Sequence, residues 1–304
     1  MAGSKTHAAA PRTRRSRRGA THRTAATSDR HELYELSVQN PEAEVEFIER
    51  IGRKLLGRAP QLLREDFCGT FHLCGEWVRR RKSHRAIGVD LDPSVLEWGL
   101  GRAGARMKPE QLRRIELHCD DVLNVRCEPV DVLTAFNFSY FLFRERETLA
   151  TYFRRCRKAL VPGGILFCDA YGGSDSFREI EEERSLDGFV YVWDQHHYNP
   201  ITGEAVNHIH FRFPDGTELR RAFSYRWRLW TLPEIRELIS EAGFEDVTVY
   251  WEGSDRKGGG NGVFTPSTRG EACEGWIAYI VARNPKATTG RKGTSKRAGS
   301  AKRA

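Results

Sequence analysis

The stretch from Leu62 to Asp90 constrains the fold of this 304-residue chain more than any other part of it. A short apolar run leads to the acids Glu65 and Asp66 and a tight turn at Cys68-Gly69-Thr70. A helix-like segment follows, and then a second apolar run that ends on Asp90. This spacing suits a βαβ unit that binds a nucleoside. The turn lets the ligand approach the backbone, and the second carboxylate can accept hydrogen bonds from both ribose hydroxyls. The stretch therefore predicts a nucleotide-type cofactor.

The alternation of apolar strands and helices extends beyond this unit. Asn40-Pro41 begins a helix that Gly57 ends, and Asp92-Pro93 begins another. The strands are predicted at 61–65, 86–90, 115–119, 130–136 and 165–169. Strands that alternate with helices predict a doubly wound, Rossmann-like α/β fold with a mostly parallel sheet and right-handed crossovers.

The pattern changes after residue 188. Residues 189–198, 204–213 and 219–230 alternate with period two and are separated by turn residues, which predicts an inserted three-stranded antiparallel meander. Thr231 and Glu234 form a capping box that begins the next helix. The last two strands, 246–251 and 275–282, are joined by a glycine-rich link without helical periodicity. We therefore expect the last strand of a seven-stranded sheet to be antiparallel.

The two faces of the meander differ in chemistry. One face is aromatic and the other carries histidine and arginine. If the aromatic face points into the molecule, a substrate beneath it should be apolar or ring-bearing. If the cationic face does, Arg226 or Arg228 could bind a carboxylate or phosphate. The aromatic face comprises Phe189, Tyr191, Trp193, Ile209, Phe211, Phe213, Leu219, Phe223, Tyr225, Trp227 and Leu229, with Arg221 as an exception. The cationic face comprises Asp194, His196, His208, His210, Arg212, Arg220, Ser224, Arg226 and Arg228.

The net charge of +8 resides in the two ends of the chain. Residues 1–30 and 284–304 each carry about +7, which leaves about −6 for residues 31–283. The ends are rich in Ala, Gly, Ser and Thr, so we expect two disordered basic tails that flank a single domain of residues 31–283. Basic tails can neutralise nucleic-acid phosphates, but more often they are solvated chain ends.

Composition narrows the class of protein further. The chain has no run of eighteen apolar residues and no apolar segment near its start, so we expect neither a membrane span nor a secretory signal. The seven cysteines are scattered without CxxC pairs, which predicts free thiols in a reducing compartment, the cytoplasm, rather than disulfides.

Five segments in order carry a resemblance to a known family. They are CGT at 68–70, GVDLDP at 88–93, CDDVLNV at 119–125, VDVLTAFNFSYF at 130–141 and LVPGGILFCD at 160–169. With them, residues 34–283 resemble the class I S-adenosylmethionine (SAM)-dependent methyltransferases, especially small-molecule enzymes with an extra antiparallel sheet after strand five. A dinucleotide site would need the three glycines of G-x-G-x-x-G, of which only Gly69 is present.

The resemblance implies a set of cofactor-binding residues. Asp90 would bind the ribose, Asp120 the adenine amino group and Val122 the adenine ring, while Asn137 would lie beside the methionine end. The chain departs from the family where Phe67 and Phe71 replace two glycines of the first turn. The full set is Glu65, Phe67, Cys68, Gly69, Thr70, Asp90, Leu91, Asp120, Asp121, Val122 and Asn137.

Methyl transfer from a sulfonium needs alignment and the exclusion of water more than it needs a base. The sequence shows no catalytic triad, and the candidates for a base are Tyr140, Tyr171 and histidines of the meander, His208 among them. Tyr34 could fold over the cofactor. His208 and His210 could bind a metal with Asp194 or His196 across a hairpin, but the sequence leaves the register open and we predict no metal.

The sequence therefore predicts a cytoplasmic SAM-dependent methyltransferase that acts on an N or O atom of a small molecule. Two alternatives remain open at this stage. One is an RNA or protein methyltransferase that holds its substrate with the basic tails, and the other is a catalytically silent SAM-fold binding module. The sequence predicts neither the acceptor nor the oligomeric state.

Overall fold

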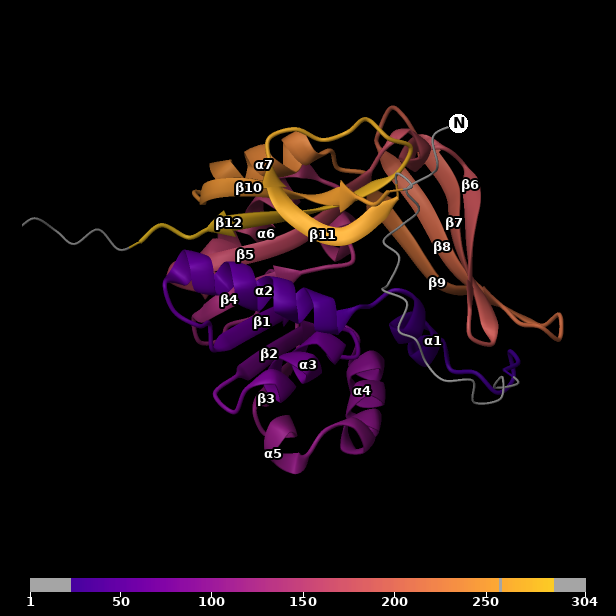
Figure 1. Ribbon diagram of the computed structural model, residues 1–304, viewed down its shortest axis with the longest axis horizontal. Coiled ribbons are helices and arrows are strands. Elements are labelled where there is room, and N and C mark those ends of the chain that lie inside the picture. The colour runs from indigo at the N-terminus through magenta and orange to yellow at the C-terminus, as the bar shows by residue number, and fades with distance from the viewer. Residues whose placement is uncertain (1–22, 257–258, 287–304) are drawn as a thin grey trace, which may run out of the picture.

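The computed structural model describes residues 23–256 and 259–286, so most of the two predicted tails lies outside the described residues. The chain forms a large sheet with helices on both faces and a smaller sheet that leans away from it (Figure 1). The strands of the large sheet are β1 (Leu62–Asp66), β2 (Arg85–Asp90), β3 (Ile115–Cys119), β4 (Val130–Ala135), β5 (Leu160–Gly172), β10 (Glu245–Ser254), β11 (Gly260–Ser267) and β12 (Trp276–Arg283).

The order of these strands is β11-β10-β12-β5-β4-β1-β2-β3. The strands β3, β2, β1, β4 and β5 pair in parallel, and β12 pairs antiparallel with β5 and with β10. The carboxyl ends of β1, β2 and β4 therefore meet at one edge of the sheet. In such sheets this edge is where ligands bind.

The helices form a layer on each face of the large sheet. Their bounds are α1 (Arg30–Ser37), α2 (Pro41–Leu56), α3 (His72–Arg80), α4 (Pro93–Arg106), α5 (Pro109–Leu112), α6 (Arg146–Ala159) and α7 (Leu232–Glu241), with 3₁₀ turns η1 (Ser139–Leu142) and η2 (Ser174–Phe177). Side chains of β5 alternate between the two layers. Ile165 and Phe167 pack with α2 and α3, whereas Leu166 and Cys168 pack with α6 and α7.

The predicted helix caps are confirmed. Asn40 accepts a hydrogen bond from Ala43 N at the start of α2, and Gly57 ends that helix with φ 73°. Asp92 caps α4 through Ser94 N, and Thr231 and Glu234 form the capping box of α7. These local signals set the helix boundaries because each satisfies backbone groups that the helix leaves without a partner.

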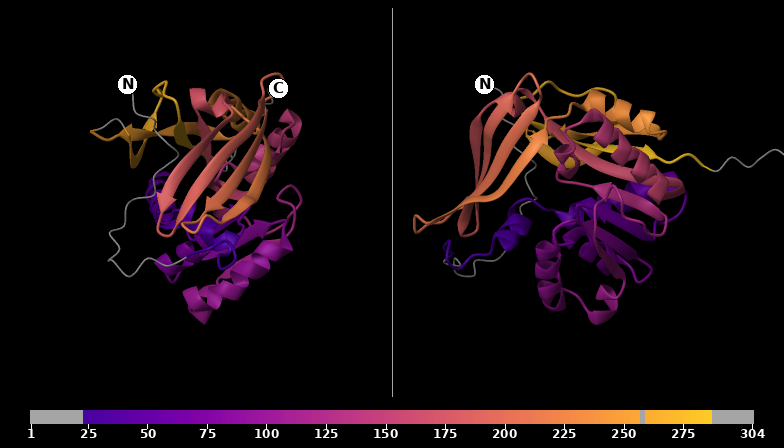
Figure 2. Two further views of the ribbon diagram at one scale, coloured as in Figure 1. Left: turned by 90° about the vertical axis from the view of Figure 1, so that its right-hand side faces the viewer. Right: turned by 180° about the vertical axis from the view of Figure 1, so that it is seen from behind.

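The smaller sheet has four strands rather than the three that were predicted. They are β6 (Ile180–Leu186), β7 (Phe189–Asn199), β8 (Glu204–Arg212) and β9 (Glu218–Arg228), paired antiparallel in chain order (Figure 2, left). The missed strand β6 lies at the edge and reads IEEERSL. Charged residues suit an exposed edge, and they hide the apolar alternation by which a strand is recognised.

The large sheet likewise has one strand more than the seven predicted. The extra strand is β11, which covers part of the glycine-rich link and pairs antiparallel with β10. Its glycines and Pro266 disfavour a strand in a sequence pattern, but both are tolerated at the edge of a sheet. The predicted antiparallel last strand is present as β12.

The folded unit extends beyond the predicted limits of 31 and 283. Asp29 caps α1 through His31 N and Glu32 N, and Ala25 N donates to Thr217 Oγ1 at the tip of the small sheet. Asn284 is buried and donates to the carbonyls of Leu160 and Val161. No helix within the described residues is long and apolar enough to cross a membrane.

Candidate functional site

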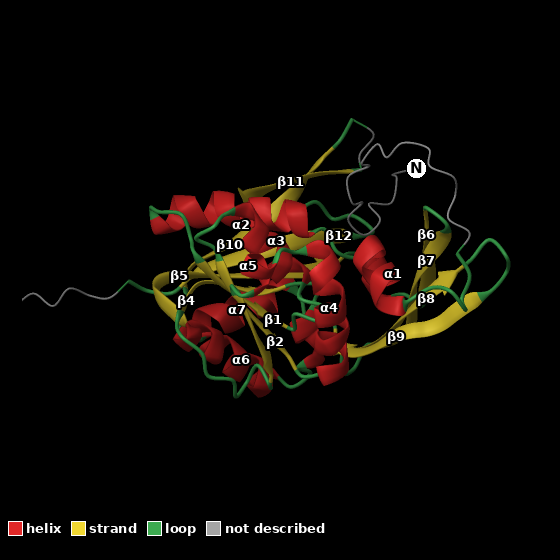
Figure 3. Cartoon of the chain, turned by 90° about the horizontal axis from the view of Figure 1, so that it is seen from below, coloured by secondary structure: helices red, strands yellow, loops and turns green. Residues whose placement is uncertain are grey.

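A cavity of about 650 Å³ lies at the carboxyl ends of β1, β2 and β4. Its floor is the turn after β1 together with Asp90, and its far wall is formed by residues 221–227 of β9. The helix α1 lies between α4 and β9 and closes a third side (Figure 3). Segments at α1, β1, β2, β4 and β9 thus contribute to one cavity.

The turn after β1 has an unusual backbone. Phe67, Gly69 and Phe71 all have positive φ, at 58°, 52° and 48°. Only glycine adopts this region without strain, so the two phenylalanines occupy conformations that family glycines would adopt freely. Phe71 is buried against Gly99, where an added Cβ would lie 2.6 Å from the Phe71 ring. The Phe67 ring lies 5.7 Å from that of Tyr152. Phe71 thus fills the core below the turn, while Phe67 lines the cavity.

Asp90 links the turn to the second strand. Its Oδ2 accepts a hydrogen bond from Gly69 N at 2.7 Å, and its Oδ1 accepts one from Asp92 N at 3.0 Å. Burial raises the pKa of Asp90, and the hydrogen bonds from Asp92 and Gly69 oppose that shift. Each carboxylate oxygen keeps a second lone pair, so Asp90 can accept two further hydrogen bonds from a ligand in the cavity.

Two more carboxylates are the last two residues of β1. Glu65 accepts a hydrogen bond from Cys74 N in the first turn of α3, and burial raises the pKa of Glu65 to about 8. Asp66 is fully buried, pairs with Arg64 Nε at 2.6 Å and accepts a hydrogen bond from Tyr152 Oη. Within the described part of the chain, Asp66 therefore has a cation partner and Glu65 has none. Glu65 also lines the cavity.

The turn after β4 is held by Asp169 of β5. Asn137 and Phe138 both have φ of 58°, and their backbone N–H groups donate to the two carboxylate oxygens of Asp169 at 2.8 and 2.9 Å. Burial nonetheless raises the pKa of Asp169 to about 7. This carboxylate fixes two strained residues and so places Asn137 in the cavity wall. The sequence analysis missed Asp169, although an acid that ends an apolar strand was a usable signal.

The structure brings together seven of the predicted cofactor residues and leaves four outside this cavity. The cavity is lined by Glu65, Phe67, Cys68, Gly69, Thr70, Asp90 and Asn137. Its lining does not include Leu91, Asp120, Asp121 or Val122. Val122 is buried after the end of β3, whereas Asp120 is exposed and Asp121 is half-buried. The adenine-side roles of these residues stay predictions.

The helix α1 covers the cavity, and its Tyr34 both lines the cavity and packs against the core. Glu35 fixes the helix in place, because it accepts a hydrogen bond from Thr70 Oγ1 at 2.7 Å and pairs with Arg106 of α4 at 2.6 Å. The rings of His31 and Tyr34 lie 5.7 and 5.0 Å from that of Phe223. His31 was missed because no helix was predicted before Asn40, although His31 lies at the edge of the predicted domain. Asp29 followed three residues later by Glu32 is typical of a helix start, and this pattern could have indicated α1.

The candidate bases Tyr140, Tyr171 and His208 do not line this cavity. Tyr140 is fully buried and donates to the backbone carbonyl of Asp169 at 2.6 Å. Tyr171 is buried in an aromatic cluster, with its ring 4.8 Å from that of Phe138. His208 lies on the opposite face of the small sheet from the cavity, bonded to Ser224. None of these three side chains is therefore placed to contact a ligand in this cavity.

The small sheet turns its aromatic face toward the large sheet. Phe223, Tyr225 and Trp227 of β9 line the cavity, and Tyr191, Trp193, Phe211 and Trp227 join the core that β5 and α6 share. On the other face, Arg226 pairs with Glu204 at 2.8 Å, and Arg228 pairs with Glu234. The aromatic face of the meander therefore points inward, and Arg221 and Arg226 of β9 also line the cavity.

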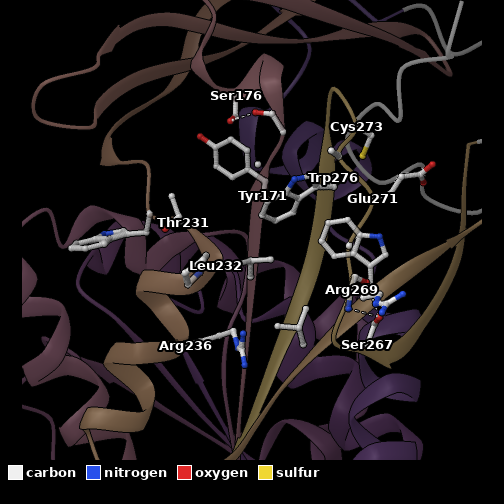
Figure 4. Close-up of a pocket in the computed structure, with 18 of the residues that line it drawn as sticks. Tyr171, Ser176, Thr231, Leu232, Arg236, Ser267, Arg269, Glu271, Cys273 and Trp276 are labelled. Atoms are coloured by element: carbon white, nitrogen blue, oxygen red, sulfur yellow. Dashed lines mark hydrogen bonds between the residues drawn. The ribbon is translucent and has the colours of Figure 1, made fainter.

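A second cavity, of about 1130 Å³, lies between the end of β5, the first turn of α7 and strand β10. Tyr171, Trp276, Arg236 and Arg269 point toward it (Figure 4). Among the described residues, its lining includes neither Asp90 nor the turn after β1. It is the larger of the two cavities, but its carboxylates, Glu271 and Glu274, lie outside the βαβ unit in which a nucleoside site is expected, so we assign the cofactor to the smaller one.

Comparison with known proteins identifies the class. Residues 67–168 match the family model described as a methyltransferase domain. This segment runs from the turn after β1 to β5 and includes Asp90 and Asn137. Together with the fold, the match supports a class I SAM-dependent methyltransferase, as the sequence motifs predicted. No curated protein matches the sequence.

Solved structures share the fold at low sequence identity. A SAM-dependent methyltransferase from Clostridium acetobutylicum ATCC 824 has 16% identity and a TM-score of 0.61, covering 84% of this chain and 97% of its own. CalS10 from Micromonospora echinaspora, an amino pentose methyltransferase, has 15% identity and a TM-score of 0.59, covering 84% and 95%. The sugar N-methyltransferase KedS8 from Streptoalloteichus sp ATCC 53650 has 16% identity and a TM-score of 0.58, covering 88% and 98%. At this identity the likeness establishes the architecture of the chain and no more.

Proposed function

We propose that this chain transfers the methyl group of SAM to an N or O atom of a small, ring-bearing molecule. The observation that carries the proposal is the single cavity in which Gly69 and Asp90 face the aromatic residues Phe223, Tyr225 and Trp227. A cofactor held on the first side would present its methyl group to an acceptor held on the second. Direct transfer requires this proximity.

The residues on the cofactor side fit SAM. Asp90 has lone pairs free for two ribose hydroxyls, and the positive φ of Gly69 lets a ligand approach the backbone closely. Glu65 is a buried carboxyl that lines the cavity and has a raised pKa, so a positively charged ligand beside it would stabilise its anion. Bound SAM would supply that charge through its sulfonium and ammonium groups, together with an activated methyl group.

The residues on the acceptor side favour a ring. Tyr225 and Trp227 stack with their ring centroids 4.6 Å apart, and Phe223 continues the same face. Flat aromatic walls bind aromatic rings and the apolar faces of sugars while they exclude water. CalS10 is an amino pentose methyltransferase and KedS8 a sugar N-methyltransferase, which supports an acceptor of this size and an amine as the acceptor atom.

The residues of this chain contribute to the reaction by holding the reactants in place and excluding water. The Asp169 carboxylate orients the Asn137 turn, and α1, anchored by Glu35, closes the cavity against water. An amine acceptor that arrives neutral needs no base, so the arrangement needs only to align the acceptor with the methyl group.

The experiment is a methyl-transfer screen with isotopically labelled SAM and a panel of amino sugars, aromatic amines and phenols. We expect a product with one added methyl group, and we expect Trp227→Ala to lower turnover while SAM affinity stays the same. The matched control is Trp251→Ala, because Trp251 lines the second cavity instead. Methylation of RNA or protein alone would refute the small-molecule assignment, and SAM binding without turnover on any acceptor would favour the silent binding module.

We place the enzyme in the cytoplasm. All seven cysteines are free, and Cys68, Cys74, Cys156 and Cys168 are buried, which suits a reducing compartment. Subcellular fractionation with compartment markers tests this location.

A further inference from the structure

We propose that Asp194, His196 and His208 form a binding site for a transition-metal ion, with Zn²⁺ as the best-fitting ion. The site lies on the face of the small sheet that points away from the methyl-transfer cavity. One carboxylate oxygen and one imidazole nitrogen from each histidine lie within 4.8 Å of one another. The proposal is independent of the proposed function, because none of the three residues lines that cavity.

The strand register creates the cluster. Asp194 of β7 is paired directly with His208 of β8. The register shifts between Gln195 and His197, which marks a bulge at His196. The bulge brings the His196 ring to 5.0 Å from the His208 ring, at an angle of 56°. Bulges redirect individual side chains in this way. The sequence alone could not give this register, which is why it predicted no metal.

Neighbouring side chains already hold two of the ligands in binding orientations. His208 Nδ1 lies 2.8 Å from Ser224 Oγ across the β8–β9 pair, which leaves Nε2 as the ligand atom. Metal-binding histidines are commonly oriented by a hydrogen bond from their other ring nitrogen.

His210 holds the carboxylate. Its Nδ1 accepts a hydrogen bond from the backbone N–H of Arg221 at 2.8 Å, so in the neutral ring the proton is on Nε2. That nitrogen lies 3.2 Å from Asp194 Oδ2 and donates to it. The side chains of His210 and Asp194 are 4% and 14% exposed, so this support is largely shielded from water.

The donor set selects the ion. Two imidazoles and one carboxylate suit Zn²⁺ and its neighbours in the first transition row, whereas Mg²⁺ and Ca²⁺ prefer oxygen ligands alone. In a tetrahedral zinc site the ligand atoms lie roughly 3.4 Å apart, so the distances in the cluster must shorten by at most about 1.4 Å. His196 can make that movement because its side chain is 50% exposed. The charge of Arg221 opposes a bound cation, while Asp194 and the nearby Glu181 favour one.

A bound ion would link β7 to β8. The inner face of the small sheet, to which both strands belong, packs in the core that it shares with β5 and α6. Trp193, the residue before Asp194, and Ile209, the residue after His208, both lie in that core. A metal ion that binds only the folded chain would therefore raise its melting temperature.

The test is calorimetric titration of the metal-free full chain with ZnCl₂, together with thermal unfolding. We expect one ion per chain, a Kd of 1 μM or below and a rise in melting temperature. His196→Ala should weaken binding at least 100-fold, and this variant should fold because His196 is exposed. The matched control is His197→Ala, an exposed neighbour that pairs with Glu179 instead.

Substitution with Co²⁺ provides an independent readout of the ligands. A tetrahedral site should give an intense visible absorption band that disappears in both His196→Ala and His208→Ala. A Kd weaker than about 100 μM would overturn the proposal. Equal losses in the His196 and His197 variants, or a cobalt band that persists in the His196 variant, would overturn it as well.

Discussion

Substitution of Asp90 by alanine tests the cofactor side of the cavity most sharply. Both oxygens of Asp90 are already oriented, Oδ2 by Gly69 N and Oδ1 by Asp92 N. Each has one lone pair left for a ribose hydroxyl, so the substitution removes two hydrogen bonds to a charged acceptor. Their loss should cost about 2–4 kcal/mol of SAM binding free energy, which weakens the Kd by about 30-fold to several hundred-fold.

The same substitution should also destabilise the turn after β1. Gly69 N and Asp92 N lose their acceptor, and a lost bond to a charged group costs about 1.5–3 kcal/mol where the partner stays buried. The assay is therefore calorimetric titration with SAM at a temperature well below the melting point of the variant, with circular dichroism to confirm the fold. Asp187→Ala is the matched control, because Asp187 is an exposed acid in the turn between β6 and β7. An unchanged Kd in folded Asp90→Ala would refute the ribose role.

Three further predictions concern the adenine side, the buried carboxylates and the chain ends. Asp120→Ala should weaken SAM binding by less than Asp90→Ala does, since a single contact is at stake, and an equal or larger loss in the same titration would contradict the assignment. Burial raises the pKa of Asp169 to about 7 from an ordinary value of 3.8, so its protonated form stabilises the fold. That stabilisation is complete below about pH 4 and is lost as the pH rises through 7. Denaturant unfolding between pH 5 and 8 should show a fall in the free energy of unfolding that is smaller in Asp169→Asn, and equal falls in both chains would sink this explanation. A chain shortened to residues 23–286 should bind SAM as the full chain does, whereas one that starts at residue 31 should melt at a lower temperature because it lacks the α1 cap Asp29. Identical melting curves would show that the cap contributes nothing.

Sequence patterns predicted the parallel part of the fold because its signals are local. The nearly continuous apolar run of β4 is buried along its whole length, and the caps Asn40, Asp92 and Thr231 mark helix starts without reference to tertiary structure. The strands that were missed, β6 and β11, lie at sheet edges. There the stabilising partner is a neighbouring strand, and the side chains need not follow an apolar pattern.

The site was predictable in part for the same reason. Gly69 and Asp90 belong to one continuous motif, so their spacing revealed them. Asp169 and Glu35 act through residues about 30 positions away in the chain, Asn137 and Thr70, and no local pattern encodes those contacts. The metal-site geometry depends on the register of β7 against β8, and a bulge at His196 decides that register.

Calorimetric titration of the full chain with SAM, S-adenosylhomocysteine and NAD tests the central claim most directly. The account predicts that SAM and its demethylated product each bind one site per chain, that they compete with each other, and that NAD produces no heat. A chain that binds NAD and not SAM, or that binds SAM equally well after Asp90→Ala, would contradict it.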